Sequence, residues 1–92
     1  MGIFDKLKDI NEMRKQAGQM QTLLAKQTVT GASSGGKIKI TIDGNMEVKS
    51  VEVAPEVAGD KAEVARQIRS ALEDLFKQHK KMLQKNFSGM LQ

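Results

Sequence analysis

The sequence has no cysteine, no tryptophan and no tyrosine, and its 92 residues include one histidine and one proline. Without cysteine the chain forms no disulfide and no thiolate metal site, which fits a reducing compartment. A lone histidine leaves no second imidazole for a metal ion. No apolar run reaches membrane-spanning length, and the first residues lack the apolar core of a signal peptide. We therefore expect a soluble, cytoplasmic protein without a metal site.

Residues for catalysis are also scarce. His79 falls near the apolar edge of a predicted helix, where a histidine is typical of boundary packing rather than of a general base. Glu73 and Asp74 are adjacent and therefore point to different sides of a helix, so they do not form an acid–base pair. Glu73 is instead predicted to pair with Lys77 at i,i+4. We expect no catalytic residues, no cofactor and no small-molecule substrate.

The middle of the chain is the one stretch with a period of two. Over residues 37–42, lysine and threonine alternate with Ile38, Ile40 and Ile42, which is typical of a strand with one buried face. Asp43-Gly44 follows as a turn able to adopt positive φ. Met46-Glu47-Val48-Lys49 is a second alternating run, and it begins a strand predicted over about residues 46–53. Residues 28–32 are predicted to add a third strand, because a two-stranded hairpin is marginal alone.

The register of this hairpin can be predicted from which side chains it buries. A two-residue loop would set Ile40 opposite Glu47 and so bury charge. A three-residue loop, Asp43-Gly44-Asn45, sets Ile42 opposite Met46 and Ile40 opposite Val48. We prefer this second register, with a bulge near Ser50 that returns Val51 and Val53 to the apolar face.

Two long amphipathic helices flank these strands. The first is predicted over about residues 4–27, with a narrow, nearly heptad apolar seam suited to helix–helix contact. Gly18 weakens this helix, and close packing there is the expected compensation. The second is predicted over about residues 61–85, with Asp60 as its cap and Glu63 reaching back to it. The candidate core or dimer residues are Leu7, Ile10, Met13, Ala17, Met20, Leu24, Ile38, Ile40, Ile42, Val51, Ile68, Leu72 and Leu75.

Charge is unevenly distributed along the chain. Residues 1–28 carry five basic and three acidic groups, residues 29–60 carry three and five, and residues 61–92 carry seven and three. From Lys77 onward there are four lysines and no acidic residue. If the helices lie antiparallel, this basic end approaches Lys6 and Lys8. Such a surface favours an anionic partner, and phosphate backbones reward it through counterion release. The lack of interleaved aromatic residues disfavours stacking on single strands.

Three stretches together resemble the YbaB/EbfC family of bacterial nucleoid-associated proteins. The first is the helical segment Met13-Arg14-Lys15-Gln16-Ala17-Gly18-Gln19-Met20-Gln21. The second comprises Val29-Thr30-Gly31, Ser34-Gly35-Gly36 and Lys39-Ile40-Thr41-Ile42-Asp43-Gly44. The third consists of Val48, Val51 and Val53 before Pro55. Gly18 replaces the family's usual glutamine, and the second helix lacks its Asn-Asp-Ala segment.

The resemblance implies an α+β protomer of order α-β-β-β-α, with a three-stranded antiparallel sheet and two long helices in one domain over residues 1–92. It also implies a tweezer-shaped homodimer, location in the cytoplasm and nucleoid, and double-stranded DNA bound by the helical arms. The candidate contacts with DNA, assigned from charge geometry, are Lys6, Lys8, Arg14, Lys15, Lys77, Lys80, Lys81 and Lys85.

Two other functions remain open at this stage. The first is a non-catalytic protein-interaction module, a helical dimer whose seam and methionine-rich end bind another protein. The second is a helix lying on an anionic membrane, which the narrow apolar seam disfavours.

Overall fold

The computed structural model describes the backbone of residues 3–88 and the side chains of residues 9–88. Its elements are, in order, α1 (Ile3–Ala25), β1 (Thr28–Ala32), β2 (Ile38–Asp43), β3 (Val48–Val53) and α2 (Lys61–Phe87). This order confirms the predicted α-β-β-β-α protomer of the α+β class. Each boundary lies within two residues of the predicted one.

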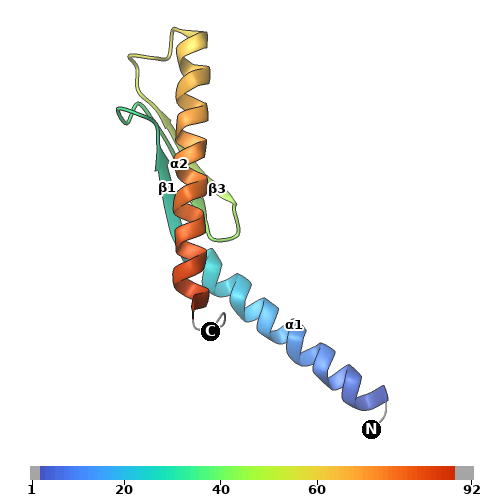
Figure 1. The fold of residues 1–92 in the computed structure, drawn as a ribbon. Coiled ribbons are helices and arrows are strands. Elements are labelled where there is room, and N and C mark those ends of the chain that lie inside the picture. The colour runs from blue at the N-terminus through green and yellow to red at the C-terminus, as the bar shows by residue number, and fades with distance from the viewer. Residues whose placement is uncertain (1–2, 89–92) are drawn as a thin grey trace.

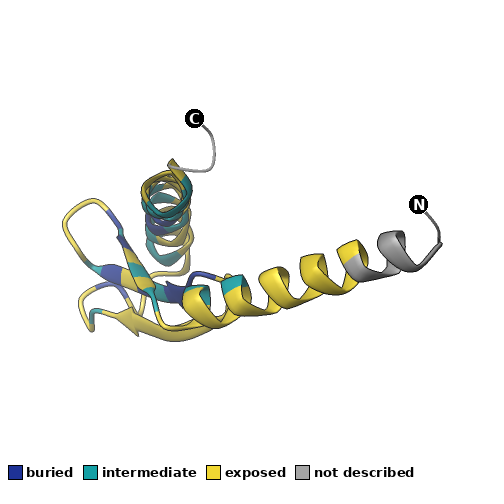
Figure 2. Ribbon diagram, turned by 90° about the horizontal axis from the view of Figure 1, so that it is seen from below, coloured by how far each residue is buried: buried dark blue, intermediate teal, exposed yellow. Residues whose placement is uncertain are grey.

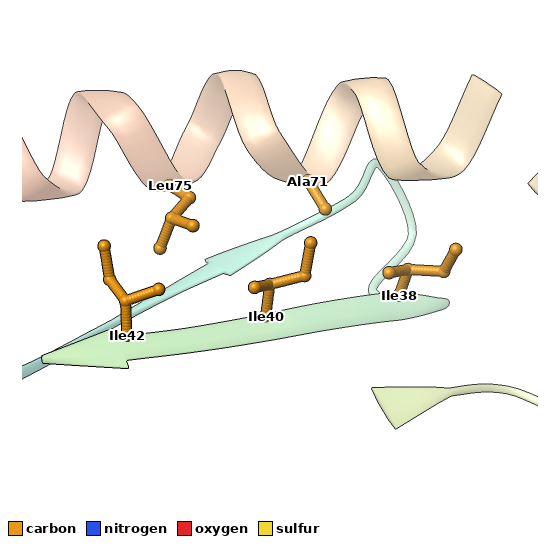
Figure 3. Close-up of a cluster of buried hydrophobic side chains, with 5 residues drawn as sticks. All are labelled: Ile38, Ile40, Ile42, Ala71 and Leu75. Carbon is orange, nitrogen blue, oxygen red and sulfur yellow. The ribbon is translucent and has the colours of Figure 1, made fainter. Parts of the chain in front are cut away.

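The three strands form one antiparallel sheet in the order β1-β2-β3, and α2 crosses one face of it (Figure 1). The isoleucines of β2, Ile38, Ile40 and Ile42, point toward Ala71 and Leu75 of α2, as Figure 3 shows. All five side chains are buried, whereas Lys39 on the opposite face of β2 is exposed. The predicted alternation of β2 is therefore the main source of the core.

The hairpin between β2 and β3 corrects the predicted register. Ile40 pairs with Val51 rather than Val48, and Ile42 pairs with Val48 rather than Met46. The register shifts between Thr41 and Ile42, so the β3 strand has its bulge beside Ser50, as expected. This arrangement places a valine opposite every core isoleucine, which the predicted register did not achieve.

The turn itself also differs from the prediction. The loop is three residues long, Gly44-Asn45-Met46, and the residue with positive φ is Met46 at 67° rather than Gly44. The amide of Met46 donates to the carbonyl of Asp43 at 3.0 Å, and the amide of Asp43 donates to the carbonyl of Glu47 at 2.9 Å. This is the common three-residue hairpin, in which the third loop residue is left-handed. Gly44 is required for another reason, because a Cβ there would lie 2.6 Å from the carbonyl oxygen of Leu24.

The start of α2 agrees with the prediction in part. The carboxylate of Asp60 accepts a hydrogen bond from the amide of Glu63 at 3.1 Å, so Asp60 is the N-cap. The side chain of Glu63 does not reach back to the cap. It binds Arg66 at 2.7 Å and Gln67 at 2.8 Å instead, because these partners lie one turn ahead on the same face. The pKa of Glu63 is lowered, first by the bond from Arg66 and then by that from Gln67.

Helix α1 does not cover the sheet but projects from it (Figures 1 and 2). From Asp9 to Gln19 every residue is exposed, and the molecule extends over 65 × 24 × 20 Å. The expected close packing at Gly18 is absent from the described chain, since no atom lies within 4 Å of a Cβ placed there. The helices are therefore not side by side, and the N-terminal end of α1 lies far from the C-terminal end of α2 (Figure 1).

Candidate nucleic-acid interface

Four lysines occupy the last turns of α2, and we refer to them as the terminal lysines: Lys77, Lys80, Lys81 and Lys85. Three of them, Lys77, Lys81 and Lys85, follow at i, i+4 and i+8 and therefore form a row along one side of the helix. Lys80 lies beside this row. All four are exposed, because the opposite side of α2 is anchored on the sheet by Ala71 and Leu75.

The terminal lysines make no ion pair with any side chain that the structure describes. The predicted pair of Glu73 with Lys77 is wrong, because Glu73 binds the guanidinium of Arg69, one turn earlier, at 3.1 Å. Arginine offers a planar donor group that holds a carboxylate better than an ammonium does. Lys77 thus keeps its charge available for an external anion.

Asp74 is the remaining acid close to these lysines. One of its oxygens accepts the amide of Ala32 in β1 at 2.9 Å, and the other accepts the side-chain amide of Gln78 at 3.3 Å. The pKa of Asp74 is lowered by the backbone bond from Ala32, then by Gln78, with a smaller contribution from the charges of Lys77 and Lys81. Asp74 therefore fastens α2 to the edge of the sheet, with both oxygens in use within the chain.

An open hollow of about 450 Å³ lies beside the row, between α2 and the start of β1. Lys81 and Lys85 border it together with polar amides, and its full lining is Gln27, Val29, Gln78, Lys81, Met82, Lys85 and Asn86. The two ammonium groups, with the remaining amide hydrogens of Gln27 and Gln78, suit a phosphate oxygen better than an apolar ligand.

The basic residues predicted on the first helix are separated from this region. Arg14 and Lys15 are exposed on the projecting part of α1. The side chains of Lys6, Lys8 and Leu7 lie outside the described residues. The predicted approach of the basic end of α2 to Lys6 and Lys8 is wrong, because the two helices meet only at their C-terminal ends (Figure 1).

The face of the sheet that holds the core continues beyond α2 as an exposed apolar surface. Val48, Val51 and Val53 are the cross-strand partners of the three core isoleucines, so they point to the same side. Helix α2 covers β1 and β2 but not β3, and these valines are 59%, 56% and 44% exposed. Phe76 on the adjacent flank of α2 is 53% exposed.

The residues predicted for a core or dimer divide into two groups. Ile38, Ile40, Ile42 and Leu75 are buried in the protomer, and Leu72 packs partly against them. The remaining described residues of the set lie at its surface or are partly exposed: Ile10, Met13, Ala17, Met20, Leu24, Val51 and Ile68. Gln27 and Asn86, which join the ends of α1 and α2, were not predicted as functional residues. Isolated polar residues at element ends carry no periodic signal that could have identified them.

No helix of the described residues combines the length and apolarity needed to cross a membrane. Among the described side chains, no three from histidine, cysteine or acidic residues lie close enough together to hold a metal ion.

A family model described as the YbaB/EbfC DNA-binding family matches residues 1–92. Among curated proteins, the chain is 32% identical over 77 residues to a nucleoid-associated protein of Polynucleobacter necessarius, covering 84% of this chain and 72% of that one. It is 40% identical over 74 residues to a nucleoid-associated protein of Caldanaerobacter subterraneus, covering 73% and 61% respectively. A third relative, from Nostoc punctiforme, is 33% identical and is matched over 52% of its length.

Among solved structures, the chain is similar to an uncharacterized protein of Helicobacter pylori. The TM-score is 0.81, and the match covers 100% of this chain and 99% of that one at 21% identity. At this identity the likeness concerns the fold, and it agrees with the α-β-β-β-α architecture described above.

Proposed function

The chain belongs to the YbaB/EbfC DNA-binding family, and from this premise we propose that it is a nucleoid-associated protein that binds double-stranded DNA through phosphate contacts. The role is non-catalytic and concerns nucleoid organisation or gene regulation in the cytoplasm. Its contacts are largely independent of base sequence, because lysine ammonium groups position a duplex without reading its base edges.

The terminal lysines are the observation that carries this proposal. They combine exposure, regular spacing and the absence of a carboxylate partner within the described chain. Lysines on a helix are commonly a solvated face, and each of them alone would fit that role. The four terminal lysines together form a basic surface beside a hollow partly lined by amide side chains. DNA phosphates that bind such a surface release the counterions condensed on the DNA.

We further propose that two copies associate through the exposed apolar surface of β3 and α2. An apolar patch on this face is costly to leave in water, and a second copy of the same chain can cover it symmetrically. The dimer then carries two sets of terminal lysines, which increases the number of phosphates that one complex contacts. The exposed seam of α1 supplies additional apolar surface for the same association.

The proposal is tested by titrating unrelated DNA duplexes at several salt concentrations. For the unmodified protein, the logarithm of the association constant should fall with the logarithm of salt concentration, with a slope of about −4 to −5 for roughly five phosphate contacts. Replacing Lys77, Lys81 and Lys85 together by glutamine should weaken binding and reduce the slope by about 3 to 4, because the dimer loses six of its eight terminal lysines and each lost contact removes about 0.9.

A matched control removes the same charge from the other end of the molecule. Lys37, Lys39 and Lys61 changed to glutamine should alter the slope by less than about 1. Equal effects of the two triple variants would show that net charge alone governs binding. Salt-independent binding, or unchanged DNA retention with loss of a co-purifying protein, would favour the protein-interaction module instead.

A further inference from the structure

Helix α1 is joined to the rest of the protein at its C-terminal end, where several hydrogen bonds hold it. The carbonyl of Gln21 accepts the side-chain amide of Asn45 at 2.9 Å. The amide of Gly44 donates to the carbonyls of both Leu24 and Gln27 at 2.9 Å. Leu24 is among the last four residues of a helix that ends at Ala25, and its carbonyl has no i+4 partner within the helix, so the tip of the β2–β3 hairpin caps α1.

A second attachment joins the end of α1 directly to the end of α2. The side-chain amide of Gln27 donates to the Asn86 oxygen at 2.9 Å, and the amide of Asn86 donates to the Gln27 oxygen at 2.7 Å. The same nitrogen of Asn86 donates to the carbonyl of Met82 at 2.7 Å. Both hydrogens of this nitrogen are thus used, and the reciprocal pair fixes the relative orientation of two planar groups. We call this pair the amide clamp.

The amide clamp lies between the lysine-bearing end of α2 and the C-terminal end of α1. Asn86 follows Lys85 and borders the hollow that Lys81 and Lys85 share. On its other side Asn86 borders a mainly apolar hollow of about 440 Å³ at the root of α1, which Met20 and Leu23 also line. The clamp therefore links the C-terminal end of α1 to the lysine-bearing end of α2.

We propose that Gln27 and Asn86 are positioning residues that set the angle of α1 relative to the terminal lysines. This inference rests on the proposed DNA-binding function, because the angle decides whether Arg14 and Lys15 of α1 reach the same duplex. Arg14 lies 13 residues before Gln27, a distance of about 20 Å along a helix. A tilt of about 10° at the joint would move Arg14 by about 3 Å, which is as long as a hydrogen bond.

The experiment measures the angle and DNA binding separately. The chain has no cysteine, so Glu12→Cys on α1 and Gln84→Cys on α2 provide two exposed sites for spin labels. Labelled protein is diluted into an excess of unlabelled protein, and the distance distribution within one chain is measured by pulsed electron paramagnetic resonance. Gln27→Ala, Asn86→Ala and the double variant are compared with Asn11→Ala, which removes an exposed amide elsewhere on α1.

The clamp variants should broaden the distance distribution, and the double variant should broaden it no further than either single variant. DNA affinity should fall about two- to tenfold, as expected for losing one or two hydrogen bonds that hold the binding-competent geometry. The salt slope should become shallower by up to about 2, because Arg14 and Lys15 no longer reach phosphates while the terminal lysines keep their contacts. The exchange variant Gln27→Asn with Asn86→Gln keeps an amide pair and should restore both measurements.

Several outcomes would overturn the inference. An unchanged distance distribution in folded clamp variants, checked by circular dichroism, would show that the clamp does not set the angle. A broadened distribution with unchanged DNA affinity would show that the angle does not matter for binding. If the unmodified protein binds no DNA at any salt concentration, the proposed function fails while the distance measurement still tests the clamp.

Discussion

At the scale of single residues, two glycines have opposite roles although both lie within regular elements. Gly31 is in β1 directly under α2, where a Cβ would come within 2.5 Å of the carbonyl oxygen of Ala71 and of the Cβ of Leu75. Gly18 is in the exposed part of α1 with nothing near it. Glycine at position 31 lets strand and helix approach closely, whereas at position 18 it only lowers helix stability.

We therefore predict opposite effects of one substitution at the two sites. Gly31→Ala should decrease the free energy of unfolding by about 1 to 3 kcal/mol, because the backbone of α2 has to move away from the sheet. Gly18→Ala should increase it by up to about 1 kcal/mol, because alanine is the better helix former. Chemical denaturation followed by circular dichroism measures both. A loss of stability in Gly18→Ala would instead indicate that a partner packs closely against α1 at this residue.

At the scale of elements, the β2–β3 hairpin depends on one buried carboxylate. Asp43 is 1% exposed and accepts the amides of Asn45 at 2.8 Å and Glu47 at 3.0 Å. The bond from Glu47 is the main cause that lowers its pKa from the ordinary value of 3.8, and burial opposes this shift. The amide of Asn45, followed by the nearby charge of Lys49, lowers the pKa further.

This lowered pKa predicts acid sensitivity of the hairpin. The unfolded chain binds a proton at Asp43 at a higher pH than the folded chain, so folding stability decreases as the pH falls below about 4. The contribution is fully present above that range. Asp43→Asn should lower stability at neutral pH and weaken its dependence on acid pH, which denaturation at pH 7, 4 and 3 can measure. An equal acid dependence in the variant would assign the effect to other carboxylates, such as Asp74.

The same hairpin shows how far the sequence predicts this fold. The alternation at Ile38, Ile40 and Ile42 was sufficient to predict β2 and its buried face. Register was predicted less well, because the valines at positions 48, 51 and 53 fit more than one loop when a bulge is allowed. The sequence does not reveal that Met46 has the positive φ of this turn. Glycine is the usual residue at such a position, but the glycine of this turn, Gly44, is needed instead for its close contact with Leu24.

The candidate interface was predictable in composition but not in arrangement. A run without acidic residues identified the terminal lysines, and spacing alone suggested that Lys77 would pair with Glu73. The competing guanidinium of Arg69 on the preceding turn decided that pairing. The separation of α1 from α2 followed from the joint at Gly44 and the amide clamp, which involve residues distant in sequence and without periodicity.

At the scale of the whole molecule, the protomer is far more extended than a globular chain of its length. Its radius of gyration is 18.7 Å, whereas a compact chain of this size would have about 12 Å. The core is small, consisting mainly of three isoleucines with Ala71 and Leu75. Among the described residues, the exposed large apolar side chains on β3, α2 and α1 outnumber the buried apolar ones. Association between two copies is the simplest way to cover this surface.

We predict that the proposed dimer depends on the face of β3 that α2 leaves open. Val51→Glu places a carboxylate on this face, and symmetry would bring two such charges into one interface. The dissociation constant should rise at least about a hundredfold, corresponding to a cost of about 3 kcal/mol for burying unpaired charge. Ser50→Glu adds the same charge at the neighbouring position, on the opposite face of the strand, and should leave the dimer intact. Sedimentation equilibrium measures both.

The two variants also separate assembly from DNA binding. Val51 is 56% exposed in the protomer, so Val51→Glu should fold and keep all four terminal lysines. Its salt slope should fall to about half, because each complex then contains one set of lysines instead of two. A monomer with an unchanged slope would mean that a single protomer makes all the phosphate contacts. A mass of one chain for the unmodified protein at micromolar concentration would remove the dimer from the proposal and leave the exposed valines to a different partner.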